Sequence, residues 1–137
     1  MRIALVCRRY YPEIGGVETH VKELAENLAK KQHEVTVFTL TNRPIQDGSQ
    51  ETIGGVNIRR FKPLKLSYSI EFPPSRMRDE IVRYSPQIVH SHSIHTFMPY
   101  FASNVKHGSK LVIPPHYLGN TTSRFRKILF MFYKPFI

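Results

Sequence analysis

Residues 3–40 read IALVCRRYYPEIGGVETHVKELAENLAKKQHEVTVFTL, and this stretch decides the fold. It begins with a continuous apolar run over residues 3–7, which is typical of a strand buried on both faces of a parallel sheet. We predict a loop over residues 8–16 that ends in two glycines, then a helix, and then a β-branched and aromatic strand over residues 34–40. Strand, glycine-bearing loop, helix and strand in this order predict a βαβ unit.

The helix between these strands has the clearest pattern in the sequence. Its apolar residues recur at helical spacing and form one stripe: Val17, Val21, Leu24, Ala25, Leu28 and Ala29. On the other face, Glu18 precedes Lys22 and Glu26 precedes Lys30 by four residues, the order that stabilises an exposed helix face. The pattern therefore predicts an amphipathic helix.

Beyond residue 40 the pattern is weaker but still alternates between strands and helices. We predict a polar loop over 41–55, strands over 56–61, 87–92 and 110–113, and helices over 75–84, 96–106 and 124–133. The helix over 96–106 must hold Pro99 in its first turn, and residues 63–74 show no clear periodicity. This alternation predicts an α/β layered fold with a mostly parallel sheet.

Composition bounds the class of protein. A chain of 137 residues with 41% hydrophobic and 22% charged residues has the size and composition of one globular domain. Cys7 is the only cysteine, which excludes an internal disulfide and a cysteine-rich zinc site. No apolar run reaches the length of a signal-peptide core or a membrane-spanning helix, so we expect a cytoplasmic protein.

The net charge of +10 predicts an anionic partner. Phosphate groups, nucleic acid and an anionic membrane surface all fit such a charge, which does not choose among them. Because the cations are scattered and no nucleic-acid-binding module is recognisable, we do not expect nucleic acid, and a basic nucleic-acid-binding domain stays a remote alternative.

Gly15 and Gly16 lie where a ligand is expected in such a sheet. Ligands bind beyond the carboxyl ends of parallel strands, and these glycines separate the first strand from the first helix. Glycine allows close approach of the backbone, and a helix N-terminus offers free N–H groups to an anion. The same pair could equally form a tight turn before the helix. Both interpretations stay open on spacing alone.

Four motifs in order resemble one known family. PEIGGVE over residues 12–18 and HEV over residues 33–35 are similar to the opening of a GT-B-fold glycosyltransferase of family 4. PQIVHSH over residues 86–92 and PPHY over residues 114–117 are similar to the family's P-D-I-V-H-x-H and T-P-H-Y. The chain departs from the family's usual residues at Gln32, Gln87 and Pro114.

The resemblance implies that this chain is the N-terminal, acceptor-side half of a GT-B fold. Such enzymes transfer a sugar from a nucleotide-diphosphate sugar to an acceptor with retention of configuration, in a cleft between two Rossmann-like domains and without a metal or other cofactor. Residues 1–137 would then form a single, incomplete Rossmann-like domain, inactive without the missing C-terminal donor domain. A non-catalytic binding or scaffold domain derived from such a half is the alternative.

The resemblance also implies roles for single residues. Gly15 and Gly16 would approach the donor diphosphate. His116 would be the catalytic residue beside the reacting sugar, where an imidazole can donate a hydrogen bond or stabilise charge. Glu18 would face the acceptor, or it is a helix-start carboxylate favoured by the helix dipole. Tyr10 and Tyr11 would line the acceptor pocket, or they pack locally.

Three histidines, His90, His92 and His95, form a separate cluster in the sequence. Strand alternation places His90 and His92 on one face, where two metal ligands could converge. No Asp, Glu or Cys lies nearby in sequence to complete a site, so we expect no metal and predict His92 as a residue that lines the acceptor cleft.

Residues 124–137 carry four cations, no acid and several large apolar side chains. Such a segment could lie in a bilayer interface, as an enzyme with a lipid-linked acceptor would require, or its apolar residues could pack against the sheet. We therefore expect either a sugar or a lipid-linked acceptor, with peripheral membrane attachment as an open alternative.

Overall fold

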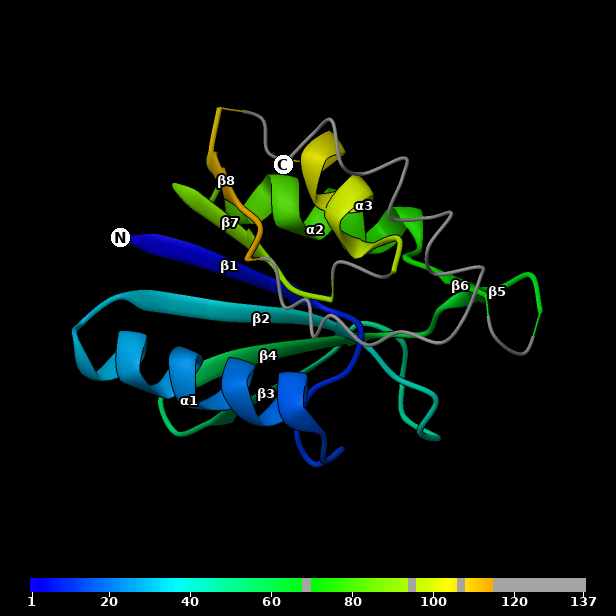
Figure 1. Ribbon diagram of the computed structural model, residues 1–137, viewed down its shortest axis with the longest axis horizontal. Coiled ribbons are helices and arrows are strands. Elements are labelled where there is room, and N and C mark those ends of the chain that lie inside the picture. The colour runs from blue at the N-terminus through cyan, green and yellow to red at the C-terminus, as the bar shows by residue number, and fades with distance from the viewer. Residues whose placement is uncertain (68–69, 94–95, 106–107, 115–137) are drawn as a thin grey trace.

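The computed structural model describes residues 1–67, 70–93, 96–105 and 108–114. The strands are β1 Arg2–Cys7, β2 Glu34–Leu40, β3 Ser49–Ile53, β4 Val56–Phe61, β5 Leu64–Lys65, β6 Glu71–Phe72, β7 Ile88–Ser91 and β8 Lys110–Val112. The helices are α1 Gly16–Lys30, α2 Ser75–Tyr84 and α3 Met98–Val105. Six strands form one sheet in the order β3–β4–β2–β1–β7–β8, and β5 pairs with β6 (Figure 1). Within the large sheet the β3–β4 pair is antiparallel and the other pairs are parallel, which confirms the predicted α/β fold.

The core has two layers, one on each face of the sheet. Ile3 and Leu5 of β1 belong to the layer under α1, whereas Ala4 and Val6 belong to the layer under α2 and α3 (Figure 1). This division follows from strand geometry, because successive side chains point to opposite faces. All four side chains are at most 3% exposed, so β1 is buried on both faces. Burial on both faces explains why the sequence of β1 is continuously apolar rather than alternating.

Helix α1 packs the predicted apolar stripe against its face of the sheet. Val21 and Ala25 are fully buried at the centre of this contact. The charged face differs from the expectation: Lys22 Nζ lies 2.6 Å from Glu26 Oε1, so the pair runs from lysine to glutamate. Glu18 does not pair with Lys22 because its carboxylate folds back toward Gly15 at the helix start.

Residues 41–55 are not a loop throughout, as the sequence predicted. Residues 49–53 form strand β3, which pairs antiparallel with β4, with Ile53 opposite Val56. Gly54 and Gly55, with φ of 59° and 79°, are the two turn residues between these strands. Two glycines at positive φ favour the tight hairpin turn that matches the twist of the strands. The adjacent glycines Gly54 and Gly55 are the sequence signal for this hairpin.

The later elements agree with the predicted order. Helix α2 covers the predicted residues 75–84, and Ser85 closes it in the left-handed conformation before Pro86. Helix α3 begins at Met98 and places Pro99 in its first turn. Strands β7 and β8 each end before the residue predicted. The predicted helix over 124–133 lies outside the described residues.

Candidate functional site at the carboxyl ends of the strands

The chain changes direction across the sheet between β1 and β7. From β1 it proceeds through α1 on one face to β2, whereas it returns from β4 through α2 on the other face to β7 (Figure 1). The carboxyl ends of β1 and β7 therefore flank a topological switch point, where ligands bind in open α/β sheets. The loop over residues 8–15 and residues His92 and Ser93 lie at this edge, directly after the two strands.

Gly15 and Gly16 form the start of α1 at this edge. Gly15 is the N-cap, with extended backbone, and makes no side-chain cap. A Cβ added at Gly15 would lie 2.2 Å from Glu18 Oε2, whereas one added at Gly16 would meet nothing within 4 Å. The carboxylate of Glu18 thus covers Gly15, and the space in front of Gly16 is open. Gly16 is thus the position at this helix start where the backbone is open to close approach.

The two tyrosines of the loop differ in exposure. Tyr10 is 2% exposed and packs in the core layer under α1, where burial raises the pKa of its hydroxyl. Tyr11 is 41% exposed, and Lys22 Nζ lies 5.5 Å from the centre of its ring. Local packing therefore accounts for Tyr10, and Tyr11 is the tyrosine that presents a surface at this edge.

His92 follows β7 and is fully buried. Its backbone N–H donates to the carbonyl of Val6, 2.8 Å away, which continues the pairing with β1. Its ring lies 4.3 Å from that of His90 and 5.9 Å from that of His20 on α1, measured between centroids. His90 and His92 do share one face, as strand alternation requires. The ring of His92 contacts the protein interior rather than an open surface.

Three further residues bear on the chemistry expected at this edge: His116, His95 and Cys7. His116 and His95 lie outside the described residues. Among the residues that the structure does describe, no group of three or more His, Cys, Asp or Glu side chains is placed to hold a metal ion. Cys7, at the end of β1, is buried, and burial raises the pKa of its thiol to about 12, which favours the protonated thiol over the nucleophilic thiolate at neutral pH.

A buried carboxylate, Glu71, holds this edge together. Arg8 Nε and Arg9 Nη2 donate to Glu71 Oε2 at 3.0 and 2.7 Å, and Asn42 Nδ2 donates to Oε1 at 3.0 Å. The Glu71 side chain is only 4% exposed. Burial alone would raise the pKa of this carboxyl, but the hydrogen bonds from Asn42, Arg9 and Arg8 outweigh burial and lower the pKa to about 2. Glu71 therefore stays ionised and joins the segments after β1 and β2 to β6.

No local signal in the sequence indicates the role of Glu71. It lies in the stretch without periodicity, and its partners are 29 to 63 positions away in the chain. Only the three-dimensional structure brings them together.

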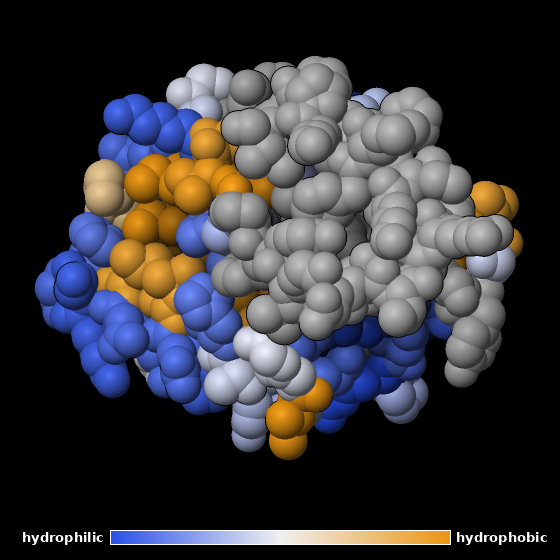
Figure 2. Space-filling model, viewed as in Figure 1, coloured by the Kyte–Doolittle hydropathy of each residue, from blue (hydrophilic) through white to orange (hydrophobic). Residues whose placement is uncertain are grey.

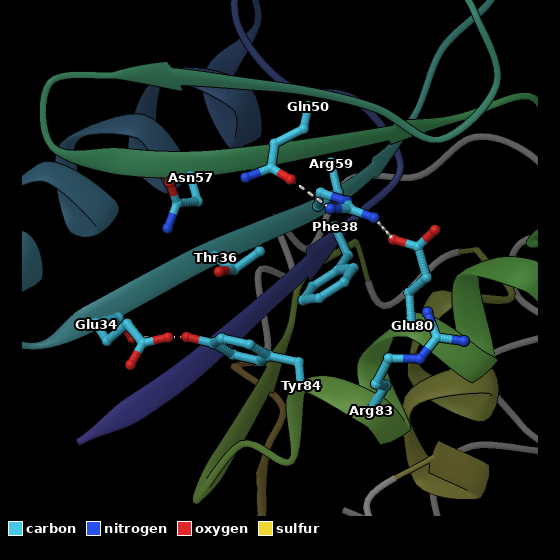
Figure 3. A pocket seen from close by; sticks show the side chains of 9 residues that line it. All are labelled: Glu34, Thr36, Phe38, Gln50, Asn57, Arg59, Glu80, Arg83 and Tyr84. Carbon is cyan, nitrogen blue, oxygen red and sulfur yellow. Dashed lines mark hydrogen bonds and ion pairs between the residues drawn. The ribbon is translucent and has the colours of Figure 1, made fainter.

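A pocket of about 340 Å³ lies away from this edge, between α2 and the sheet face formed by β2, β3 and β4 (Figure 3). Figure 3 shows the guanidinium of Arg59 between Gln50 and Glu80, and Tyr84 donating its hydroxyl to the carbonyl of Glu34 at 2.9 Å. Glu80 also pairs with Arg76, 3.4 Å away on the same helix. These contacts connect α2 to the sheet and pair two of the four charged side chains that line the pocket, Arg59 and Glu80.

Comparisons with known proteins agree on one family. The model of Glycosyltransferase Family 4 matches residues 14–137. The chain is 26% identical over 94 residues to a GDP-mannose-dependent alpha-mannosyltransferase of Mycobacterium tuberculosis, covering 66% of this chain and 25% of that protein. It is 30% identical over 108 residues to one of the subunits of the human phosphatidylinositol N-acetylglucosaminyltransferase, covering 73% of this chain and 22% of that protein. The chain therefore spans about a quarter of the length of these relatives.

A solved structure shows the same fold. Sucrose-phosphate synthase from Thermosynechococcus elongatus superposes with a TM-score of 0.63 at 18% identity, over 93% of this chain and 38% of that one. The likeness confirms the Rossmann-like layered domain predicted as the N-terminal half of a GT-B fold. Within the described residues, no helix combines the length and the apolar character needed to cross a membrane.

Proposed function

The chain belongs to glycosyltransferase family 4, and on this premise we propose that it is the acceptor-side part of a retaining glycosyltransferase. The whole protein would transfer a sugar from a nucleotide-diphosphate sugar to an acceptor, with the donor domain supplied by sequence beyond these 137 residues. The 137-residue chain alone would not turn over.

One observation carries this proposal: the open start of α1 at the switch point of the sheet. A Cβ added at Gly16 would meet nothing within 4 Å, whereas the carboxylate of Glu18 lies against Gly15. A phosphate oxygen of the donor would approach from the exposed side of Gly16, beside the Glu18 carboxylate that covers Gly15, since glycine allows close approach of the backbone and the N-terminus of a helix favours an anion. The carboxylate of Glu18 is then within the first helical turn, where it can accept a hydrogen bond from an acceptor hydroxyl.

The other predicted residues take supporting roles in this proposal. Tyr11 would present its exposed ring to the acceptor. Tyr10 and His92, whose side chains are buried, would shape the acceptor site through the loops that they hold in place rather than by contact. His116 would donate a hydrogen bond to the reacting sugar or stabilise charge near its anomeric carbon.

The acceptor is proposed to be lipid-linked. Two observations support this: the net charge of +10, which favours an anionic surface, and a relative whose name includes phosphatidylinositol. Attachment at a membrane surface would then be peripheral and cytoplasmic.

An isosteric substitution that removes the charge tests the role of Glu18. In the whole protein, Glu18→Gln is expected to lower sugar transfer about tenfold or more, because an amide is a weaker acceptor than a carboxylate. Glu23→Gln, an exposed position on the same helix, is the matched control and is expected to leave transfer unchanged. Equal transfer by the two variants would remove the acceptor role of Glu18.

His116→Ala tests the catalytic assignment. We expect a large loss of transfer, on the order of 100-fold, with an unchanged melting temperature, because one electrostatic contact to the transition state is removed. Full turnover by a folded His116→Ala protein would refute the role.

A further inference from the structure

We propose that Arg43, Lys62 and Lys65 form a binding pocket for a phosphate ester, separate from the start of α1. The pocket has a volume of about 250 Å³ and lies beyond the carboxyl ends of β2 and β4. Its walls are these three cations together with Thr41, Asn42 and two prolines. Among the residues that the structure describes, no acidic one lines this pocket. The proposal concerns binding and does not rest on transferase activity.

The three cations have no carboxylate partner in the described part of the chain. Its ion pairs involve other cations: Arg8, Arg9, Lys22, Arg59, Arg60 and Arg76. The backbone of the pocket cations is fixed, because Arg43 N donates to Thr41 Oγ1 at 3.2 Å and Lys62 N donates to Asp47 Oδ1 at 2.7 Å. Three positive charges are thus placed around one hollow and remain unneutralised.

The acids nearest in the fold are already occupied. Glu71 is paired in register with Lys65 across the β5–β6 ladder, yet its carboxylate is taken by Arg8, Arg9 and Asn42. Asp47 accepts from the backbone N–H of Lys62 and from the Arg76 guanidinium. Since neither carboxylate pairs with these exposed cations, only solvent ions balance their charge, and an anionic ligand can take the place of those ions.

The shape of the pocket favours a compact anion. Thr41 N donates to the carbonyl of Phe61 at 2.9 Å, so the ends of β2 and β4 form a fixed floor. Pro44 and Pro63 limit backbone freedom on two sides. Arginine and lysine together supply several donors to phosphate oxygens, and the guanidinium of Arg43 can bind two of them at once.

Two sources of the phosphate ester are compatible with this surface. A soluble phosphorylated molecule would fill the pocket alone. A phospholipid headgroup would place acyl chains beside it, and Leu64 and Leu66 are 61% and 75% exposed next to Lys65. Figure 2 shows apolar side chains at the end of the molecule where β5 and β6 lie. Basic and apolar residues in alternation suit the surface of an anionic bilayer.

The test uses the 137-residue chain with two variants of equal charge. The pocket variant combines Arg43→Gln, Lys62→Gln and Lys65→Gln. The control combines Lys30→Gln, Lys31→Gln and Lys110→Gln, three exposed cations at the opposite edge of the sheet. Calorimetric titration with glycerol 3-phosphate, with glycerol as the control, measures binding of a soluble phosphate ester. Sedimentation with phosphatidic acid vesicles, with phosphatidylcholine vesicles as the control, measures binding to a phospholipid headgroup.

We expect the wild type and the control to bind with similar affinity and the pocket variant to bind about tenfold more weakly, because three modest charge interactions are lost together. Binding of glycerol 3-phosphate identifies a soluble ligand class, and binding to phosphatidic acid vesicles alone identifies a headgroup. An equal loss of binding affinity in the pocket variant and the control variant, or no binding of either probe by the wild type, would overturn the proposal. If the triple variant does not fold, as judged by circular dichroism, Lys65→Gln and Lys110→Gln are compared instead.

Discussion

Two buried carboxylates, Glu71 and Glu80, each bind two arginines, yet they organise different parts of the molecule. Glu71 joins the loops after β1 and β2 to β6 at the carboxyl edge of the sheet. Glu80 binds Arg76 within α2 and Arg59 on β4, and so it connects a helix to a sheet face. The difference shows that similar ion pairs serve two purposes here: one shapes the candidate site, and the other holds an element of the fold.

The two networks also differ in what remains when the acid is removed. If Glu80 were removed, Arg59 would keep its hydrogen bond to Gln50, and Arg76 would keep its ion pair with Asp47. Arg8 has no second acidic partner in the described residues, whereas Arg9 keeps Glu13 at 3.2 Å. Loss of Glu71 therefore leaves more unpaired charge than loss of Glu80.

The largest effect is expected from Glu71→Gln. Removing one partner from a buried network leaves charge unpaired, and we expect a loss of about 2–3 kcal/mol in the free energy of unfolding, at the lower end of what buried pairs show because Arg8 is partly exposed. Urea denaturation at pH 7 measures this value. A change below about 0.5 kcal/mol, the range of ordinary surface substitutions, would contradict the role of Glu71.

Acid titration of the stability should report the contribution of Glu71. The pKa of Glu71 is lowered from 4.5 to about 2, so its contribution to stability is fully present above pH 4.5 and is lost as the pH falls from 4.5 toward 2. Glu71→Gln should flatten this part of the stability profile. Equal slopes in Glu71→Gln and the wild type between pH 5 and pH 3 would show that another group carries the acid sensitivity.

Glu80→Gln is expected to cost less, about 1 kcal/mol, because both of its arginines retain other acceptors. The same urea experiment gives the comparison. If Glu80→Gln destabilised the protein more than Glu71→Gln does, the sheet-face network would be the stronger of the two, and the contrast between the two carboxylates would be reversed.

The sequence predicted the β1–α1–β2 unit of the fold well and strand β3 poorly. The β1–α1–β2 unit depends on local periodicity, so the bounds of its two strands and the start of its helix could be predicted within one residue. Strand β3 was missed because its residues are polar and only the Gly54-Gly55 turn indicated it.

The candidate site shows the same division. Gly15, Gly16 and Glu18 could be placed from a motif, since their positions depend on one strand and one helix. The partners of Glu71 could not be predicted, because they come from three segments that meet only in the folded chain. The exposure of the loop residues could not be predicted either: Tyr10 and His92 are buried, whereas Tyr11 is exposed.

The smallest effect on stability and the most direct test of the proposed active site come from Gly16→Ala. The added methyl meets nothing within 4 Å, so the folded chain should be as stable as the wild type or slightly more stable. In the whole protein, the same methyl would occupy the space in front of the helix start where the donor diphosphate is proposed to approach. The measurement is sugar transfer by Gly16→Ala beside Asn27→Ala, an exposed position on the same helix. Transfer at least about tenfold lower in Gly16→Ala alone, at unchanged stability, is predicted, because close approach of the backbone needs glycine. Equal transfer by both variants would contradict the placement of the active site at this edge.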